Sequence, residues 1–149
     1  MEKWLILAIF TQVVLTSVIM IVMGRRRFAA AKQRQFPLSA FRTMDLAGAN
    51  ESVITAARSF DNQFQMPILF YVVTMLLLVM NSQRQLLEQA PLLDGVFVGL
   101  AWFFVALRVL HAVIHLTSNH VRARFNTFLL SCIVLWMIWL RFIWGIVMV

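Results

Sequence analysis

The chain has 149 residues, of which 62% are hydrophobic and only 13% are charged. So apolar a composition excludes a soluble domain of this length, and the chain is long enough for one compact unit only. Its formal net charge of +7 would suit nucleic-acid binding in a soluble protein, but the basic residues are concentrated between apolar stretches, so we expect the lipid bilayer as partner and no nucleic acid.

Four apolar stretches are long enough to cross a membrane, which takes about 20 mainly apolar residues. They cover residues 4–23, about 55–80, 96–117 and 125–144. Four segments cannot close a barrel, so every span must be helical. The sequence therefore predicts an all-α integral membrane protein, a four-helix transmembrane bundle that forms a single domain over residues 1–149.

The first stretch has no small-residue cleavage pattern and precedes its positive cluster, so we expect it to remain as a helix rather than to be removed as a signal peptide. Residues 24–50 follow, in which Phe36-Pro37 predicts a break. This loop sets one acid, Asp45, against Arg25, Arg26, Arg27, Lys32, Arg34 and Arg42. By the positive-inside rule, loops 24–50 and 118–124 are cytoplasmic and both termini lie outside.

The second stretch begins with polar residues. Its strictly apolar part, Met66–Met80, rises only about 22 Å at about 1.5 Å per residue, which is short of a hydrocarbon core of about 30 Å. The preceding turns must therefore enter the membrane or its interface. There Arg58, Asn62 and Gln65 are spaced i, i+4 and i+7 on one helical face, and Pro67 predicts a bend.

The third stretch carries a longer polar stripe. Its members are spaced i, i+3, i+7, i+11 and i+14 along one helical face: Arg108, His111, His115, Asn119 and Arg122. Such residues at membrane depth are costly unless they face partners or water, so they are functional candidates. We expect both stripes at the same depth near the cytoplasmic side. This predicts a shared pocket for a ligand that is anionic at one end.

The fourth stretch contains the single cysteine, Cys132, which excludes a disulfide framework and a cysteine-based metal site. Near its end, Arg141 lies among Trp136, Trp139 and Trp144. This pattern predicts an arginine that extends to the outer headgroups within an aromatic belt.

The polar residues could form a metal site, an ion path or a binding site for an anionic ligand. His111 and His115 could face one metal ion, but zinc usually needs a third or fourth ligand, and only Asp61 and His120 remain, so no metal is expected. An ion path would need several intramembrane acids, and Asp61 is the only one. What remains is a cationic, hydrogen-bonding site made of Arg58, Asn62, Gln65, Arg108, His111, His115 and Arg124.

Such a site suits a small anionic thiol cofactor next to a lipophilic co-substrate dissolved in the membrane, since arginines bind carboxylates and favour thiolates. The alternative is that the same residues hold the bundle or an oligomer together through interhelical hydrogen bonds. The spacing of the residues favours neither interpretation over the other.

Two motifs resemble those of the membrane-associated proteins in eicosanoid and glutathione metabolism, the MAPEG family. Arg58-Ser-Phe-Asp-Asn62-Gln-Phe-Gln65, followed by Pro67, is similar to the family pattern R-x-x-x-N-x-x-E with a proline shortly after. Arg108-Val-Leu-His111-Ala-Val-Ile-His115, with Arg124 nine residues later, resembles a pattern of an arginine, an aromatic or histidine, a tyrosine and a later arginine. The size, the four spans and the loop charge extend the resemblance over nearly the whole chain.

The resemblance implies a homotrimer of four-helix protomers that binds glutathione between subunits near the cytoplasmic side. Arg58, Asn62 and Arg108 match positions that hold glutathione, and Gln65, His111 and His115 are expected to line the same site. Arg124 matches the arginine that stabilises the glutathione thiolate in catalytic members. The implied activity is that of a glutathione-dependent transferase or peroxidase that acts on a lipophilic electrophile or hydroperoxide.

The chain departs from the family pattern at three points. Gln65 replaces the usual glutamate, His115 replaces a common tyrosine, and Pro67 comes one residue early. These changes are compatible with two interpretations: a bacterial-type member in the inner membrane, or a protein that has lost glutathione binding. The family also contains a non-enzymatic lipid-binding protein, so the alternative function is that of a non-catalytic trimeric lipid-binding or scaffold protein.

Overall fold

The computed structural model of the chain describes residues 1–34, 46 and 48–148, so the break expected at Phe36-Pro37 lies outside the described residues. The described elements are α1 (Glu2–Lys32), α2 (Glu51–Asp61), the 3₁₀ turn η2 (Asn62–Phe64), α3 (Met66–Leu86), α4 (Gly95–Leu116) and α5 (Val121–Val147). Among these residues there is no strand.

Four helical rods are long and apolar enough to cross a membrane: α1, the continuous segment Glu51–Leu86, α4 and α5. The chain is therefore an all-α integral membrane protein built as a four-helix bundle. The third rod matches its predicted stretch to within one residue, whereas the other three extend several residues beyond theirs.

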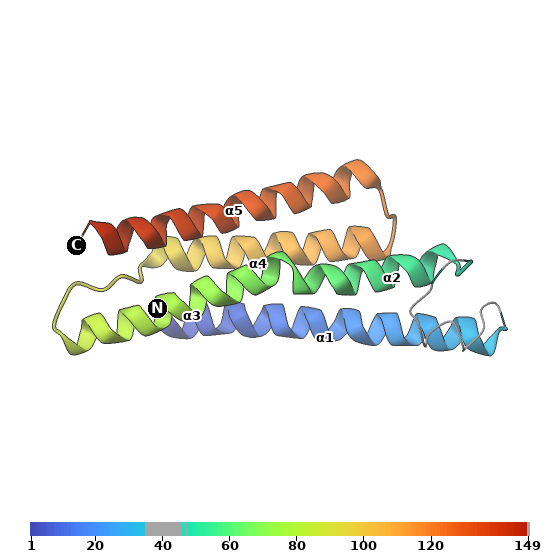
Figure 1. Cartoon of the computed structure of the whole chain (residues 1–149), viewed down its shortest axis with the longest axis horizontal. Helices are drawn as coiled ribbons and strands as arrows, with labels where there is room; N and C mark the ends of the chain where they lie inside the picture. The colour runs from blue at the N-terminus through green and yellow to red at the C-terminus, as the bar shows by residue number, and fades with distance from the viewer. Residues whose placement is uncertain (35–45, 47, 149) are drawn as a thin grey trace.

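The rods lie alongside one another, with α2 and α3 joined end to end as one rod (Figure 1). At the right of that view α1 and α4 end and α2 and α5 begin; we call this the basic end, because Arg25, Arg26, Arg27, Arg122 and Arg124 lie there. The N-terminus, the C-terminus and the connection between α3 and α4 lie at the opposite end.

The second rod is interrupted at Gln65, whose backbone has φ −104° and ψ −103°. Pro67 lies in the first turn of α3, where its missing N–H costs nothing, but its ring would clash with the carbonyl of a helix continued from Gln63. The chain therefore tightens into η2 and restarts at Met66. The bend that Pro67 predicted is confirmed.

An apolar core joins the rods toward the opposite end. Phe70 of α3 stacks on Phe104 of α4, with ring centroids 4.6 Å apart, and both side chains are fully buried. Large apolar side chains such as Phe10, Trp136 and Leu140 point away from this core. In a bilayer these outward residues contact lipid rather than water, so the bundle has an apolar inside and an apolar outside.

At the basic end, one arginine connects three rods. Arg26 of α1 donates from Nη1 to the carbonyl oxygen of Ser52 (3.0 Å) at the start of α2, and from Nη2 to that of Leu116 (2.7 Å) at the end of α4. A helix C-terminus leaves carbonyls without intrahelical partners, and a cation is the favourable group to place there. This arrangement fixes the ends of the elements that carry the polar stripes.

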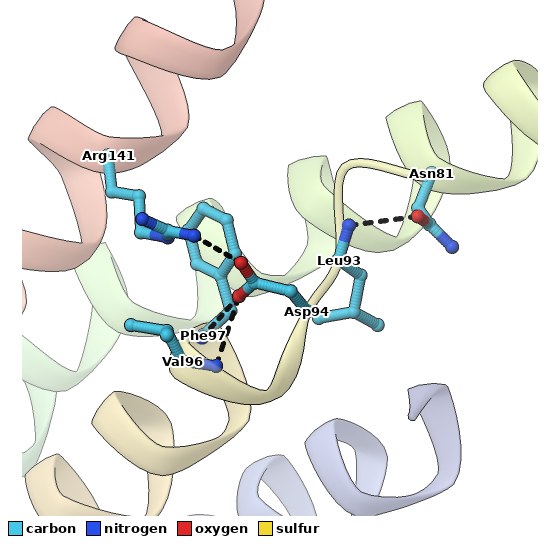
Figure 2. Close-up of polar contacts among 6 residues, drawn as sticks. All are labelled: Asn81, Leu93, Asp94, Val96, Phe97 and Arg141. Carbon is cyan, nitrogen blue, oxygen red and sulfur yellow. Dashed lines mark hydrogen bonds and ion pairs between the residues drawn. The ribbon is translucent and has the colours of Figure 1, made fainter. Parts of the chain in front are cut away.

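At the opposite end, acidic and amide side chains fix the start of α4 (Figure 2). Asp94 accepts hydrogen bonds from the backbone N–H groups of Val96 and Phe97 (both 3.0 Å) and pairs with Arg141, whose guanidinium also lies 5.0 Å from the Phe97 ring. Arg141, which is expected to extend to the headgroups, also has a partner that the sequence pattern does not predict, the Asp94 carboxylate of the same chain. Asn81 accepts from the Leu93 N–H at 3.0 Å.

Candidate functional site

The two polar stripes meet at a cavity near the basic end. It has a volume of about 230 Å³ and lies between η2, α4 and α5. Its lining residues are Asn62, His111, Val121, Arg124, Phe125 and Phe128. Three of the predicted site residues, Asn62, His111 and Arg124, therefore line one cavity, although they come from three different elements.

His111 reaches the cavity from the second-last turn of α4 and is only 2% exposed. Its Nδ1 lies 3.0 Å from the carbonyl oxygen of Arg124. Because a carbonyl can only accept, Nδ1 carries the hydrogen. The hydroxyl of Thr127 lies 3.4 Å from the same nitrogen and itself donates to the carbonyls of Ala123 and Arg124. The histidine thus holds the backbone of the first turn of α5.

Arg108 lies behind the cavity wall and is fully buried. Its Nη2 donates to the carbonyl oxygen of Asn62 at 3.0 Å, and its guanidinium carbon is 6.0 Å from the centre of the Phe128 ring. Its Nε and Nη1 have no hydrogen-bond partner within the described parts of the chain. Arg108 therefore supports two residues that line the cavity without lining it.

His115 is also buried, at 3% exposure, one turn beyond His111. The two imidazole rings meet edge to face with centroids 5.8 Å apart. Its Nδ1 has no partner among the described residues. His115 therefore places a polar ring inside the bundle, next to His111.

Arg58 and Gln65 do not line the cavity. Both lie on the exposed side of the second rod, on the same ridge as Asp61, whereas Asn62 is half-buried at the edge that faces the cavity. The shared helical face that the spacing predicts exists, but only one of its three members points toward α5.

Arg124 is half-buried in the first turn of α5, and its side chain is held from outside the cavity. Its Nη1 donates to Oδ1 of Asn119 at 2.6 Å, and Nδ2 of Asn119 donates to a carboxylate oxygen of Glu51 at 3.0 Å. Asn119 was predicted on the polar stripe, but neither of these contacts was predicted, and Glu51 was not among the predicted site residues. The sequence feature that could have pointed to a role for Asn119 is its position just after the end of a helix.

A second, apolar groove lies next to the cavity, toward the opposite end. It has a volume of about 320 Å³ and is lined by Met66, Leu69, Leu135, Trp136 and Trp139 of α3 and α5. Met66 lies one turn beyond Asn62, and Leu135 two turns beyond Phe128, so the same two rods line both spaces. A polar space and an apolar space thus adjoin along one seam of the bundle.

Metal chemistry has little support in the ligand set. Over residues 1–34, 46 and 48–148 no group of three or more His, Cys, Asp or Glu side chains is placed to hold a metal ion. The site instead offers amide, imidazole and guanidinium groups, which suit an anionic organic ligand.

The family model for MAPEG proteins matches residues 5–144, which is nearly the whole chain and includes every residue of the site. The chain belongs to the MAPEG family. MAPEG proteins are membrane proteins of glutathione and lipid metabolism, and they generally use glutathione. No curated protein and no solved structure matches the chain.

Proposed function

We propose that this MAPEG protein is a membrane-embedded glutathione-dependent transferase or peroxidase that acts on a lipophilic electrophile or hydroperoxide. The observation that carries the proposal is the position of Arg124, which lines the cavity and whose guanidinium is held by Asn119 at 2.6 Å. A fixed cation beside a bound thiol is the group that favours a thiolate over a thiol.

The residues around the cavity fit part of glutathione. A volume of about 230 Å³ is below the range of about 300–1,000 Å³ typical of small-molecule pockets, so the cavity takes only one end of a tripeptide. We assign it the cysteine end, beside Arg124 and Asn62. The rest of the ligand would extend over the exposed ridge with Arg58 and Gln65, whose guanidinium and amide suit its carboxylates and amino group.

The position of the ligand on the exposed ridge also supports a homotrimer. Arg58, Asp61 and Gln65 are exposed on one ridge that begins within a membrane-spanning rod, where facing lipid would be costly. A neighbouring copy that covers the ridge would enclose the ligand between subunits. We place the basic end in the cytoplasm, where glutathione is abundant, and both termini outside, in the inner membrane of a bacterium.

The two reactants would bind in the two adjacent spaces, glutathione in the cavity and the co-substrate in the apolar groove. Arg124 stabilises the thiolate, Asn62 and His111 shape the cavity, and the apolar groove with Trp136 and Trp139 admits the lipophilic co-substrate from the bilayer. Attack of the thiolate on an electrophilic carbon forms a carbon–sulfur bond and expels the leaving group, such as a halide, as an anion. Attack on the terminal oxygen of a hydroperoxide instead breaks the O–O bond, which gives the alcohol after protonation and oxidises the glutathione to its sulfenic acid; a second glutathione then forms the disulfide and water.

The second candidate is a non-catalytic trimeric lipid-binding or scaffold protein. The groove favours it, because all five lining residues are apolar or tryptophan and can hold an acyl chain without any reaction. In that case the polar residues only fix the bundle, as the hydrogen bonds of Arg26 and Arg108 do.

The two candidates are separated by turnover in detergent-purified protein. We expect conjugation of a hydrophobic aryl halide or reduction of an organic hydroperoxide that depends on glutathione, and a loss of about 100-fold in Arg124→Ala, the size of effect seen when one preorganised transition-state donor is removed. Arg122→Ala is the matched control, because Arg122 lies in the same turn but is exposed and outside the cavity lining.

The absence of turnover together with no thermal stabilisation by millimolar glutathione would reject the enzyme in favour of the lipid-binding protein. Turnover that survives in Arg124→Ala would leave the class of enzyme intact but refute the role given to Arg124.

A further inference from the structure

The connection between α4 and α5 contains one residue in a left-handed conformation. Asn119 has φ +48°, and its backbone N–H donates to the carbonyl of Ile114 at 2.8 Å, which closes the end of α4. Asparagine tolerates this conformation better than most residues, so the backbone alone accounts for its presence. The backbone conformation does not account for the hydrogen bonds that the side chain makes.

The side-chain amide of Asn119 is used at both ends. Its Oδ1 accepts from Nη1 of Arg124 at 2.6 Å, and its Nδ2 donates to Oε1 of Glu51 at 3.0 Å. An amide has one accepting and one donating end, so these two contacts determine which way it faces. Glu51, in the first turn of α2, thereby fixes the amide that holds Arg124, in the first turn of α5.

A neutral amide between the two charges has a chemical consequence. If Glu51 paired directly with Arg124, the carboxylate would occupy two guanidinium donors and compensate the charge that faces the cavity. The hydrogen bond to Asn119 takes one donor and brings no charge. The guanidinium is thus oriented and still cationic toward a ligand.

We propose that Asn119, itself fixed by Glu51, is the positioning residue that holds the Arg124 guanidinium in the cavity for thiolate stabilisation. This inference rests on the proposed function. Arg124 is then held at two points, at its carbonyl by His111 (3.0 Å) and at its guanidinium by Asn119. Without the second point the long side chain regains its rotamers and leaves the cavity for part of the time.

Asn119→Gly is the informative variant, since glycine accepts the positive φ without strain and only the amide is removed. We expect kcat to fall about 10- to 100-fold, the range for misplacing a catalytic group by about 1 Å, while KM for the lipophilic substrate changes little. The ultraviolet absorbance of the thiolate of bound glutathione should fall with kcat. Ser118→Gly, at an exposed neighbouring position, should leave both at the wild-type level.

Glu51 provides a second and independent test. Glu51→Gln keeps an oxygen that accepts from Asn119 and should retain most of the rate, whereas Glu51→Ala should reproduce part of the Asn119→Gly loss. Rescue by the conservative variant distinguishes positioning from a general need for a negative charge at the start of α2.

A double-mutant cycle decides whether Asn119 acts through Arg124. In the Arg124→Ala background, Asn119→Gly should cause no further loss of kcat. Losses that multiply, or an Asn119→Gly variant with wild-type kcat and thiolate absorbance, would overturn the inference and leave the proposed function standing. Wild-type protein without glutathione turnover would overturn both.

Discussion

Arg108 is a buried cation with a single hydrogen bond among the described residues, and its replacement is the sharpest test of how the site is built. It is fully buried, makes one hydrogen bond, to the Asn62 carbonyl, and leaves Nε and Nη1 without partners among the described residues. Arg108→Met keeps a long unbranched side chain. The variant loses the hydrogen bond, at a cost of about 1.5–3 kcal/mol, but it also removes the penalty of several kcal/mol for burying the guanidinium charge.

We therefore expect the free energy of unfolding of the variant to be larger than that of the wild type by about 1–2 kcal/mol, which raises Tm by roughly 2–8 °C for a chain of this size. The assay is thermal unfolding of the detergent-solubilised protein, with Arg122→Met as a control at an exposed position, where a change within about 0.5 kcal/mol is expected. Turnover should fall sharply, because Asn62 and Phe128 lose their support. A Tm that drops by several degrees would refute the reasoning, since it would show that Arg108 is well satisfied in the native protein.

Three further predictions concern other parts of the bundle. Asp94→Ala should destabilise the protein by about 1–2 kcal/mol because the helix cap is lost, whereas Asp94→Asn keeps the cap and should cost less than about 1 kcal/mol, the value of a partly exposed ion pair; equal losses in thermal unfolding would contradict this division. Gln65→Glu should lower KM for glutathione about fivefold, since a charged hydrogen bond is worth about 1 kcal/mol more than a neutral one, and an unchanged KM would place Gln65 away from the amino group. Trp136→Ala should raise KM for the lipophilic substrate about tenfold, with the KM for glutathione as an internal control, because truncating an aromatic side chain that packs on a bound ligand costs more than about 1 kcal/mol.

The four rods and the bend at Gln65 were predictable because they depend on local properties of the sequence. Runs of apolar residues have no other place than the membrane, and Pro67 cannot continue a helix whichever residues surround it. The stripe on α4 was equally local. His111 and His115 both face inward as the helical period requires, and Arg108 connects this face to Asn62. The predicted stripe was too long, because α4 ends at Leu116 and leaves Asn119 in the connection and Arg122 in α5.

The rest of the site depends on contacts between distant residues, which spacing does not contain. Arg58 and Gln65 share a helical face with Asn62, yet the packing of the second rod against α5 turns only Asn62 toward the cavity. The pairing of Arg141 with Asp94 joins residues 47 positions apart in the sequence. Positional periodicity identifies a face, but the neighbouring rods decide which edge of that face is used.

Arg26, Arg84 and Arg108 all donate to main-chain oxygens, those of Leu116, Gly145 and Asn62 among them. Because every residue type supplies such an oxygen, the residue at the receiving position can change without loss of the bond. The arginine cannot change as freely, since a lysine ammonium does not reproduce the planar fork that lets Arg26 reach two helices. In a set of related sequences these contacts would therefore leave no pair of positions that vary together, and a contact map inferred from co-variation would omit connections between helices at both ends of the bundle.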